Sequence, residues 1–365
     1  MEDMVTKMIS QKFWAQQKVL VTGCTGFKGA WLSLCLSRLG SKVSGVALPP
    51  PTNPSLFETA GVGSDIEYSI VDIRDFKALE QAVRRLQPEV VFHLAAQALV
   101  RPSYEDPIDT YMTNVMGTVH LLETVRRVPS IRAVVIVTSD KCYENQEWRW
   151  AYRENEAMGG FDPYSSSKGC AELVTSAYRR SFFPPQQHSE HLVGVASARA
   201  GNVIGGGDWS RDRLVPDIAL SLADDRVLEI RNPNAIRPWQ HVLDPLAGYL
   251  MLAERLVSDG PEYSEGFNFG PPEVNARPVQ DIVNQFLASW GLPKRDWKVS
   301  DKPQPHEAKF LKLDSSKAQG LLGWQSKLEI QKALDWTTEW YRSYYRDPSS
   351  AREATIQQID RYLGL

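Results

Sequence analysis

Tyr164 and Lys168 are spaced as a chemical pair, four residues apart at the start of a predicted helix. Side chains at that spacing share one face of a helix. An ammonium group beside a phenol favours the phenolate, so we expect Lys168 to lower the pKa of Tyr164. A tyrosine tuned in this way takes a proton from a sugar hydroxyl while a hydride leaves the same carbon. The pair therefore predicts an oxidoreductase site for a nicotinamide nucleotide, with Lys168 also bonded to its ribose.

A glycine-rich turn near the N-terminus predicts where that nucleotide binds. The residues from Thr22 to Gly29 read TGCTGFKG and connect a buried apolar strand to a helix. Gly23 permits a tight turn, Gly26 lets the backbone approach a pyrophosphate, and Gly29 lets the helix pack closely. The amides that open the helix then face the phosphates. A purely structural turn is the alternative. The expected cofactor-binding residues here are Gly23, Thr25, Gly26, Phe27, Lys28 and Gly29.

The second strand lacks the acidic residue that would hold the ribose of NAD. Residues 46–52 read VALPPPT, with no Asp or Glu and no Arg to receive a 2′-phosphate. The cofactor is therefore predicted to be NAD, while the preference over NADP is left open. Asp72 and Ile73, at the end of the third strand, are expected to contact the adenine.

Strands and helices alternate through the first half of the chain, as in a doubly wound parallel sheet. Short apolar runs without polar alternation predict strands that are buried on both faces. The predicted strands are Lys18–Thr22, Lys42–Leu48, Ile66–Ile73, Glu89–Ala96, Ala133–Ser139 and Val193–Ala200. The predicted helices are Gly29–Leu39, Asp75–Leu86, Pro107–Val125, Tyr164–Arg180, Val215–Ala223, Val279–Trp290 and, as a terminal amphipathic helix, Leu328–Tyr345. We expect an α/β fold with a Rossmann-type doubly wound parallel sheet and a smaller C-terminal α/β lobe.

The pattern changes near residue 200, where glycine and proline become more frequent and irregular stretches separate the helices. We expect residues 1–200 to form a NAD-binding domain, with segments near 235–250 returning to it. Residues 201–365 are expected to form the substrate-binding domain.

The composition excludes several other classes of function. The 365 residues include 41 Lys and Arg against 44 Asp and Glu, a formal charge of -3, which gives no electrostatic reason to expect nucleic acid. No apolar run approaches the roughly 20 residues that cross a bilayer, and residues 1–10 lack an apolar signal segment. The four cysteines form no CxxC pair and the six histidines no HxxxH pair. We therefore expect a cytoplasmic protein with reduced thiols, no metal, and no membrane or nucleic-acid partner.

The glycine turn and the Tyr164/Lys168 pair together resemble the extended short-chain dehydrogenase/reductases. The resemblance covers nearly the whole chain, including HLAAQ at residues 93–97 and TNVMGT at residues 113–118. It implies a tightly held NAD, contacted also by Ala95 and Ala96, and a nucleotide-sugar substrate. The helices predicted at Pro107–Val125 and Tyr164–Arg180 resemble the pair that forms a four-helix homodimer interface in this superfamily.

The residues after the fifth strand narrow the resemblance to the nucleoside-diphosphate-sugar 4,6-dehydratases. Those enzymes carry Thr-Asp-Glu where this chain has Ser139, Asp140 and Lys141. Together with GFKG at residues 26–29 and RAGNVIGGGDW at residues 199–209, this variant is similar to the branch that acts on CDP-linked glucose.

The same resemblance implies a role for each of the three residues. Asp140 protonates the leaving C6 hydroxyl, and Ser139 hydrogen-bonds the C4 oxygen beside Tyr164. For Lys141, three roles remain open. A lysine at its usual pKa of about 10.4 is protonated, and it needs burial or neighbouring cations such as Lys168 to act as a base. Lys141 would then take the C5 proton; otherwise it stabilises the C5 enolate, or it is a solvated side chain.

The resemblance also assigns residues to the nucleotide sugar. Asn202 falls where the family uses an amide to hold a phosphate or sugar oxygen, and Arg213 and Arg237 fall where it binds diphosphate and ribose. Arginine suits this task because its planar fork bonds phosphate bidentately. His306 is a further candidate. The alternative functions are a dehydratase for another nucleotide, a 4-epimerase, and a non-catalytic NAD-binding scaffold, although the last should lack the Tyr–Lys pair.

Overall fold

The structure is a computed structural model that describes residues 9–300 and 310–365. A seven-stranded parallel sheet forms its centre. Its strands are β1 (Lys18–Thr22), β2 (Lys42–Ala47), β3 (Glu67–Ile70), β4 (Val90–His93), β5 (Ala133–Val137), β6 (Gly194–Arg199) and β10 (Gly266–Asn268). They are ordered β10-β6-β5-β4-β1-β2-β3, and every neighbouring pair is parallel. The predicted Rossmann-type fold is confirmed, and each of the six predicted strands is present.

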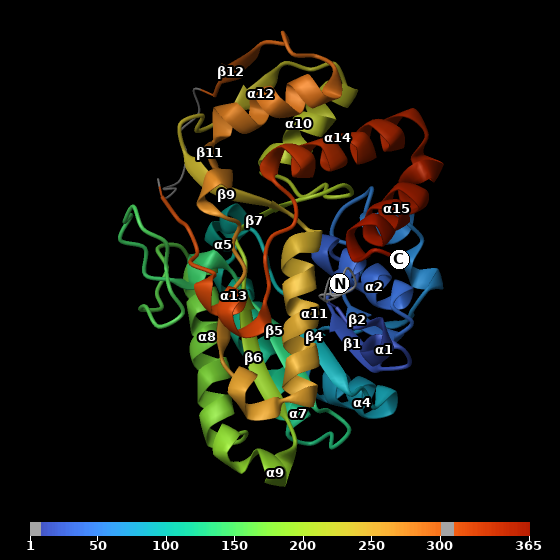
Figure 1. The fold of residues 1–365 in the computed structure, drawn as a ribbon, viewed down its shortest axis with the longest axis vertical. Helices are drawn as coiled ribbons and strands as arrows, with labels where there is room; N and C mark the ends of the chain where they lie inside the picture. The colour runs from blue at the N-terminus through green and yellow to red at the C-terminus, as the bar shows by residue number, and fades with distance from the viewer. Residues whose placement is uncertain (1–8, 301–309) are drawn as a thin grey trace, which may run out of the picture.

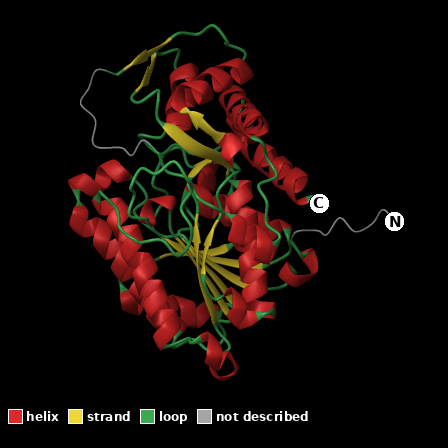
Figure 2. Ribbon diagram, turned by 60° about the vertical axis from the view of Figure 1, so that its left-hand side comes forward, coloured by secondary structure: helices red, strands yellow, loops and turns green. Residues whose placement is uncertain are grey.

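Helices cover both faces of this sheet (Figure 2). The helices on one face are α2 (Phe27–Arg38), α11 (Leu243–Ser258) and α15 (Ala351–Leu363), and those on the other are α4 (Phe76–Leu86), α7 (Gly117–Val125) and α8 (Pro163–Ser181). In β1, Val19 and Val21 join the first apolar cluster, whereas Leu20 joins the second. This division explains why the central strands are apolar without alternation.

The helices begin where polar side chains satisfy their first amides. Asp75 accepts a hydrogen bond from the Ala78 amide at the start of α4, and Asp162 accepts one from the Ser165 amide at the start of α8. Pro163 occupies the first position of α8, where its missing N–H costs nothing. The start of α8 is therefore fixed, which in turn fixes where Tyr164 lies.

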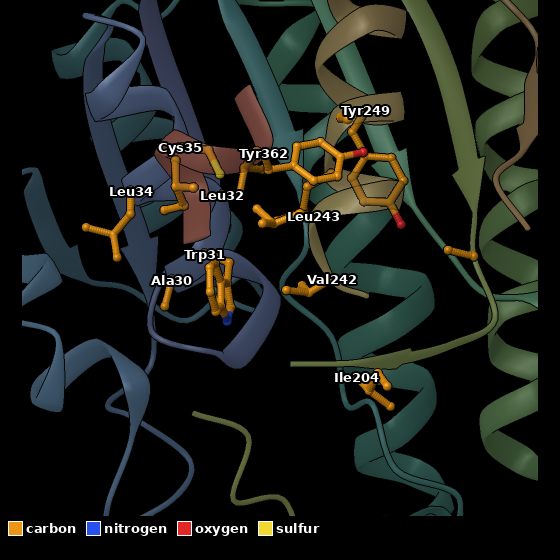
Figure 3. Packing of buried hydrophobic residues seen from close by; sticks show 14 of the residues in the cluster. Ala30, Trp31, Leu32, Leu34, Cys35, Ile204, Val242, Leu243, Tyr249 and Tyr362 are labelled. Carbon is orange, nitrogen blue, oxygen red and sulfur yellow. The ribbon is translucent and has the colours of Figure 1, made fainter. Parts of the chain in front are cut away.

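The core beneath the cofactor turn joins segments that are far apart in the sequence. Figure 3 shows side chains of α2 and α11 facing one another, with Tyr362 of α15 beside them. Trp31 is fully buried and its indole N–H donates to the Gly206 carbonyl at 3.0 Å. The last helix thus completes the core around the first crossover.

A smaller lobe lies above the main sheet in Figure 1 and follows directly from the end of β6. It holds a three-stranded sheet of β7 (Asn202–Ile204), β9 (Ile236–His241) and β11 (Ala276–Pro278), and a pair of β8 (Leu228–Ile230) with β12 (Trp297–Val299). Its helices are α10 (Leu214–Ala223), α12 (Val279–Trp290) and α14 (Ile330–Arg346). The division of the chain at residue 200 stays a prediction; β10 and α11 follow that residue and pack with the main sheet.

The short helices connect these layers. They are α1 (Gln11–Trp14), α3 (Leu56–Thr59), α5 (Val100–Glu105), α6 (Pro107–Tyr111), α9 (His188–His191) and α13 (Ser316–Leu322). In the part of the chain described, no helix combines the length and apolarity that a bilayer crossing needs.

Two helix predictions need correction. The segment Pro107–Val125 is not one α-helix, because a π-helical turn at Met112–Met116 separates α6 from α7. The helix predicted at Leu328–Tyr345 is α14, but it is not terminal. The chain reverses after Arg346 and continues as α15, which packs against α2.

Candidate active site

The glycine turn forms a tight cradle between β1 and α2. Gly23 has a φ of +73°, and a Cβ there would lie 2.7 Å from the Ala95 backbone nitrogen. A Cβ on Gly29 would lie 2.1 Å from the Gly23 carbonyl oxygen, so glycine is required for α2 to approach this closely. Gly26, the N-cap of α2, has no side chain to bond the first amides of the helix. Amides left without a side-chain cap at a helix N-terminus attract anions, so the turn fits the diphosphate of the predicted dinucleotide.

Other predicted cofactor residues hold the edges of this cradle. Thr25 donates from its hydroxyl to the Leu48 carbonyl at 2.9 Å, which ties the turn to the end of β2. The Ala95 amide donates to the Thr22 hydroxyl at 3.2 Å, which ties the end of β4 to β1. Asp72 is bound by Arg74, which holds the pKa of that carboxyl below its usual range. The predicted adenine contact would therefore use a carboxylate that already has a partner.

Tyr164 and Lys168 lie one turn apart on α8, and both side chains are buried. Burial raises the pKa of Tyr164 to about 12, and a hydrogen bond with the Ser139 hydroxyl opposes this rise. Burial also lowers the pKa of Lys168 to about 8, opposed by the nearby Cys142 and Glu172. The pKa of the phenol is therefore raised overall because desolvation dominates, and a lowering of it by Lys168 stays a prediction.

The segment after β5 brings its three predicted residues to the same place. It forms a short 3₁₀ turn at Asp140–Cys142. The Ser139 hydroxyl donates to Asp140 Oδ1 at 2.9 Å and accepts from the Lys141 amide at 3.2 Å. A Cβ on Gly201 would lie 2.8 Å from Asp140 Oδ2, so glycine at that position leaves room for the carboxylate. Ser139 and Asp140 are buried, whereas Lys141 is half-buried.

These side chains line a cavity of about 380 Å³ between the sheet and the smaller lobe. Its lining includes many of the residues predicted from the sequence: Lys28, Ser139, Asp140, Lys141, Tyr164, Asn202, Arg213 and Arg237. These residues come from segments up to about 200 positions apart, so the fold alone brings them together. His306 lies outside the described residues.

The predicted substrate residues line the cavity beyond Tyr164. Asn202 has its side-chain nitrogen buried and, among the described residues, without a hydrogen-bond partner. A buried donor in that state is costly unless a ligand satisfies it. Arg213 donates to Asp208 Oδ2 at 2.9 Å, which fixes its position at the cavity wall. Arg237 donates to the Ile236 carbonyl at 2.9 Å.

Lys28 has a position that the sequence motif did not reveal. It was predicted as part of the cofactor turn, but its side chain lines the cavity with Asp140 and Tyr164. Burial, together with the positive charges of Arg213 and Lys168, lowers its pKa to about 7, while Asp140 and Asp208 act in the opposite direction. Lys28 therefore lies on the substrate side of the site as well as in the cofactor turn.

Sequence reasoning also missed a buried network beneath α8. Glu172 accepts hydrogen bonds from Ser197 and from Arg199, at 2.6 and 2.8 Å. Arg199 in turn donates to the Tyr143 hydroxyl, which donates to Asn268 of β10. The position of Glu172, four residues after Lys168, was the one available signal.

Comparison with known proteins identifies relatives along most of the chain. The family described as GDP-mannose 4,6 dehydratase matches residues 20–337. CDP-glucose 4,6-dehydratase from Salmonella typhimurium is 55% identical over 339 residues, which cover 93% of this chain and 94% of the relative. dTDP-glucose 4,6-dehydratase from Haemophilus influenzae is 26% identical, covering 88% of this chain and 97% of that protein.

Solved structures share the fold. dTDP-glucose 4,6-dehydratase from Bacillus anthracis, in complex with NAD, superposes with a TM-score of 0.74 at 22% identity, covering 91% of this chain and 98% of that one. UDP-glucose 4-epimerase from Thermotoga maritima, with UDP-glucose, gives a TM-score of 0.75 at 21% identity, covering 89% and 98%.

Proposed function

Because this chain belongs to the GDP-mannose 4,6 dehydratase family, we propose that it removes water from a nucleotide-linked glucose. The substrate is CDP-glucose and the product is CDP-4-keto-6-deoxyglucose, with NAD used and regenerated. The observation that carries this proposal is that Asp140 and Lys141 line the same cavity as Tyr164. An oxidation at C4 needs only Tyr164, Lys168 and NAD, whereas an elimination across C5 and C6 needs an acid and a base as well. The 55% identical Salmonella relative supports CDP-glucose as the substrate.

The first task of the site is to hold the reactants. The turn from Gly23 to Gly29 holds the cofactor diphosphate, and Lys168 bonds the ribose next to the nicotinamide. When bound there, NAD would supply the acceptor for the hydride of C4 and the donor of the hydride to C6. Tyr164 Oη takes the proton of the C4 hydroxyl, and the Ser139 hydroxyl hydrogen-bonds the same oxygen. The result is a ketone at C4.

The second task is the elimination. The C4 ketone acidifies the proton on C5, and Lys141 Nζ removes it. Asp140 gives a proton to the C6 hydroxyl, which leaves as water, so a C5–C6 double bond remains. Lys141 then returns a proton to C5 as C6 is reduced. Transfer of the proton that Tyr164 gained to Asp140 restores both groups, so the cycle is balanced.

The product of the reaction tests this proposal directly. The full chain would be incubated with CDP-glucose in deuterated water, and the sugar analysed by mass spectrometry and NMR. We expect the loss of one water, a ketone at C4 and deuterium at C5. An epimer of unchanged mass would instead identify a 4-epimerase. Parallel incubations with dTDP-, UDP- and GDP-glucose test the nucleotide.

The proposed assembly is a homodimer formed by α8 and the segment from α6 to α7. This region exposes apolar side chains that water would otherwise cover: Ile108 is 76% exposed and Leu173 is 59% exposed, and Met112 and Met116 lie on the same segment as Ile108. Exposed apolar surface of this kind is typical of protein interfaces. Light scattering on the wild type and on Ile108→Asp should give a dimer and a monomer, respectively.

The proposed compartment is the cytoplasm. The four cysteines are free, and three of them are buried. Free structural thiols persist in a reducing compartment.

A further inference from the structure

The active-site cavity continues past Arg213 into the smaller lobe. Its far wall is formed by the first turn of α10, by β8 and by residues that follow it, including Val215, Asp217, Glu229 and Arg231. If the hexose lies at Tyr164 and the diphosphate at the arginines, the nucleotide base falls against this wall. Side chains of this wall would then contact the base and determine which base binds.

Asp217 differs from the other carboxylates of this wall. Asp212 is 2.9 Å from Arg231, Asp208 is 2.9 Å from Arg213, and Glu229 is 2.9 Å from Lys298. The ion pair of Asp217 is long, with 3.9 Å between its Oδ2 and Arg231 Nη2.

Arg231 cannot easily close that gap. Its Nη1 and Nη2 donate to the side chain and the backbone carbonyl of Asp212, at 2.9 and 2.7 Å. These two bonds hold the guanidinium toward Asp212. Among the described residues, the Asp217 carboxylate accepts no hydrogen bond.

The Asp217 carboxylate is open to a ligand. Its side chain is 45% exposed, and the partial burial raises the pKa of its carboxyl to about 6. Arg231 and Arg101 oppose this rise, whereas Asp212 and Asp208 add to it. A ligand that covers this carboxylate must donate a hydrogen bond to it, because covering it without a donor would cost the desolvation of the charge.

Cytosine presents such a donor, whereas uracil and thymine do not. The C4 position of cytosine carries an amine that donates, while the same position of uracil and thymine carries an oxygen that accepts. A carboxylate bonds the first and repels the second. We propose that Asp217 selects the base of the substrate by accepting a hydrogen bond from the exocyclic amine of cytosine.

This inference rests on the proposed function, since it deepens the same site. Its test therefore uses binding of the free nucleotides CDP and UDP to the full chain, measured by isothermal titration calorimetry, rather than turnover. We expect the wild type to bind CDP at least about 100-fold more tightly than UDP, because a site built around a hydrogen bond strongly rejects a ligand that cannot make it.

Three variants make the test specific. In Asp217→Asn the amide can either accept or donate, so the preference for CDP should fall to about tenfold or less. In Asp217→Ala, CDP should bind more weakly while UDP gains little. Asp224→Asn is the matched control because it removes the same charge from the other end of α10. Asp224 is the C-cap of that helix and is paired with Arg226. The control should keep the wild-type preference, and thermal melting of all variants checks that they fold.

The inference is overturned if the wild type shows no preference for CDP or if Asp217→Asn keeps the full preference. It is also overturned if Glu229→Gln, and not Asp217→Asn, abolishes the preference. The two proposals fail separately. A protein that prefers CDP through Asp217 but leaves CDP-glucose unchanged contradicts only the dehydratase function. A protein that dehydrates CDP- and UDP-glucose equally well contradicts only the role of Asp217.

Discussion

Arg199 Nη2 lies 2.8 Å from Glu172 Oε2, and both side chains are buried. Glu172 also accepts from Thr138, the last residue before Ser139, and from Ser197 of β6. The ion pair therefore joins α8, the helix that carries Tyr164, to the end of β6. The hydrogen bond from Thr138 joins the same helix to the segment after β5, which carries the other predicted catalytic groups.

Replacing Glu172 with glutamine should affect both stability and pH dependence. The variant leaves the buried Arg199 without its countercharge, so we expect the free energy of unfolding to fall by about 3 kcal/mol. The negative charge of Glu172 raises the pKa of Lys168, so its removal should move the alkaline limb of the pH–rate profile to lower pH. Urea unfolding and initial rates across pH measure the two effects.

Glu123→Gln is the matched control for Glu172→Gln. Glu123 also pairs with an arginine, Arg127, at 2.9 Å, but this pair lies on the surface. Its loss should cost less than about 1 kcal/mol and leave the pH profile unchanged. Equal losses in the two variants would show that the buried pair has no special role.

Lys141→Ala should abolish exchange of the C5 hydrogen of the substrate with solvent. Lys141→Arg keeps the positive charge but cannot act as a base near neutral pH. If Lys141 is the base, exchange is lost in both variants; if it only stabilises the enolate, the arginine variant keeps part of the exchange. NMR of CDP-glucose in deuterated water gives the rates. Exchange near the wild-type rate in both variants would exclude either role.

Lys28 should make stability depend on pH. Its pKa falls from 10.5 to about 7 on folding, so between these values the unfolded chain binds more protons than the folded chain. Stability from this group therefore rises with pH through that window, and at pH 7 or below the buried charge is unfavourable. Lys28→Met should be more stable than the wild type at neutral pH, by roughly 1 kcal/mol after solvent screening is allowed for.

Thermal melting across this pH range tests the Lys28 prediction. The difference in Tm between Lys28→Met and the wild type should shrink as the pH approaches 10. Lys42→Met, at an exposed position on β2, serves as the control and should show no such trend. A constant difference at every pH would mean that Lys28 is not desolvated in the folded protein.

Gly29→Ala should disrupt the cofactor cradle. The new Cβ would lie 2.1 Å from the Gly23 carbonyl oxygen, which is backbone and cannot rotate away. We expect dinucleotide affinity, measured by fluorescence titration with NADH, to fall at least about tenfold, with a loss of roughly 2 kcal/mol in stability. Gly320→Ala is the control, because nothing lies within 4 Å of its Cβ in α13. That variant should gain up to about 1 kcal/mol.

The sequence was sufficient for those parts of the fold that repeat a strong local pattern. β1 and α12 have the predicted bounds, and the apolar runs of β2 to β6 were long enough to recognise. β10 was missed because Gly266–Asn268 is three residues long and carries no periodicity. The π-helical turn at Met112–Met116 was missed because its side chains also suit an α-helix.

The residues of the candidate site also fall into those that a local pattern predicts and those that only the whole fold brings together. Residues within one motif, such as the glycine turn or the pair on α8, were found because their spacing is local. Lys28 was placed in the motif, but its approach to Asp208 depends on how the smaller lobe folds back. The rise in the pKa of Tyr164 was not predicted because burial is a property of the whole fold. No local spacing relates Arg199 to Glu172.

The position of β10 limits how such proteins can be recombined. This strand pairs with β6 through Gly266 and Ser197, although more than sixty residues, including those of the three-stranded sheet, separate the two in the sequence. A chimera made with a single crossover near residue 200 would take adjacent strands of one sheet from different parents. Exchange of substrate preference between relatives is therefore easier by replacing short wall segments, such as the start of α10, than by exchanging the C-terminal half of the gene.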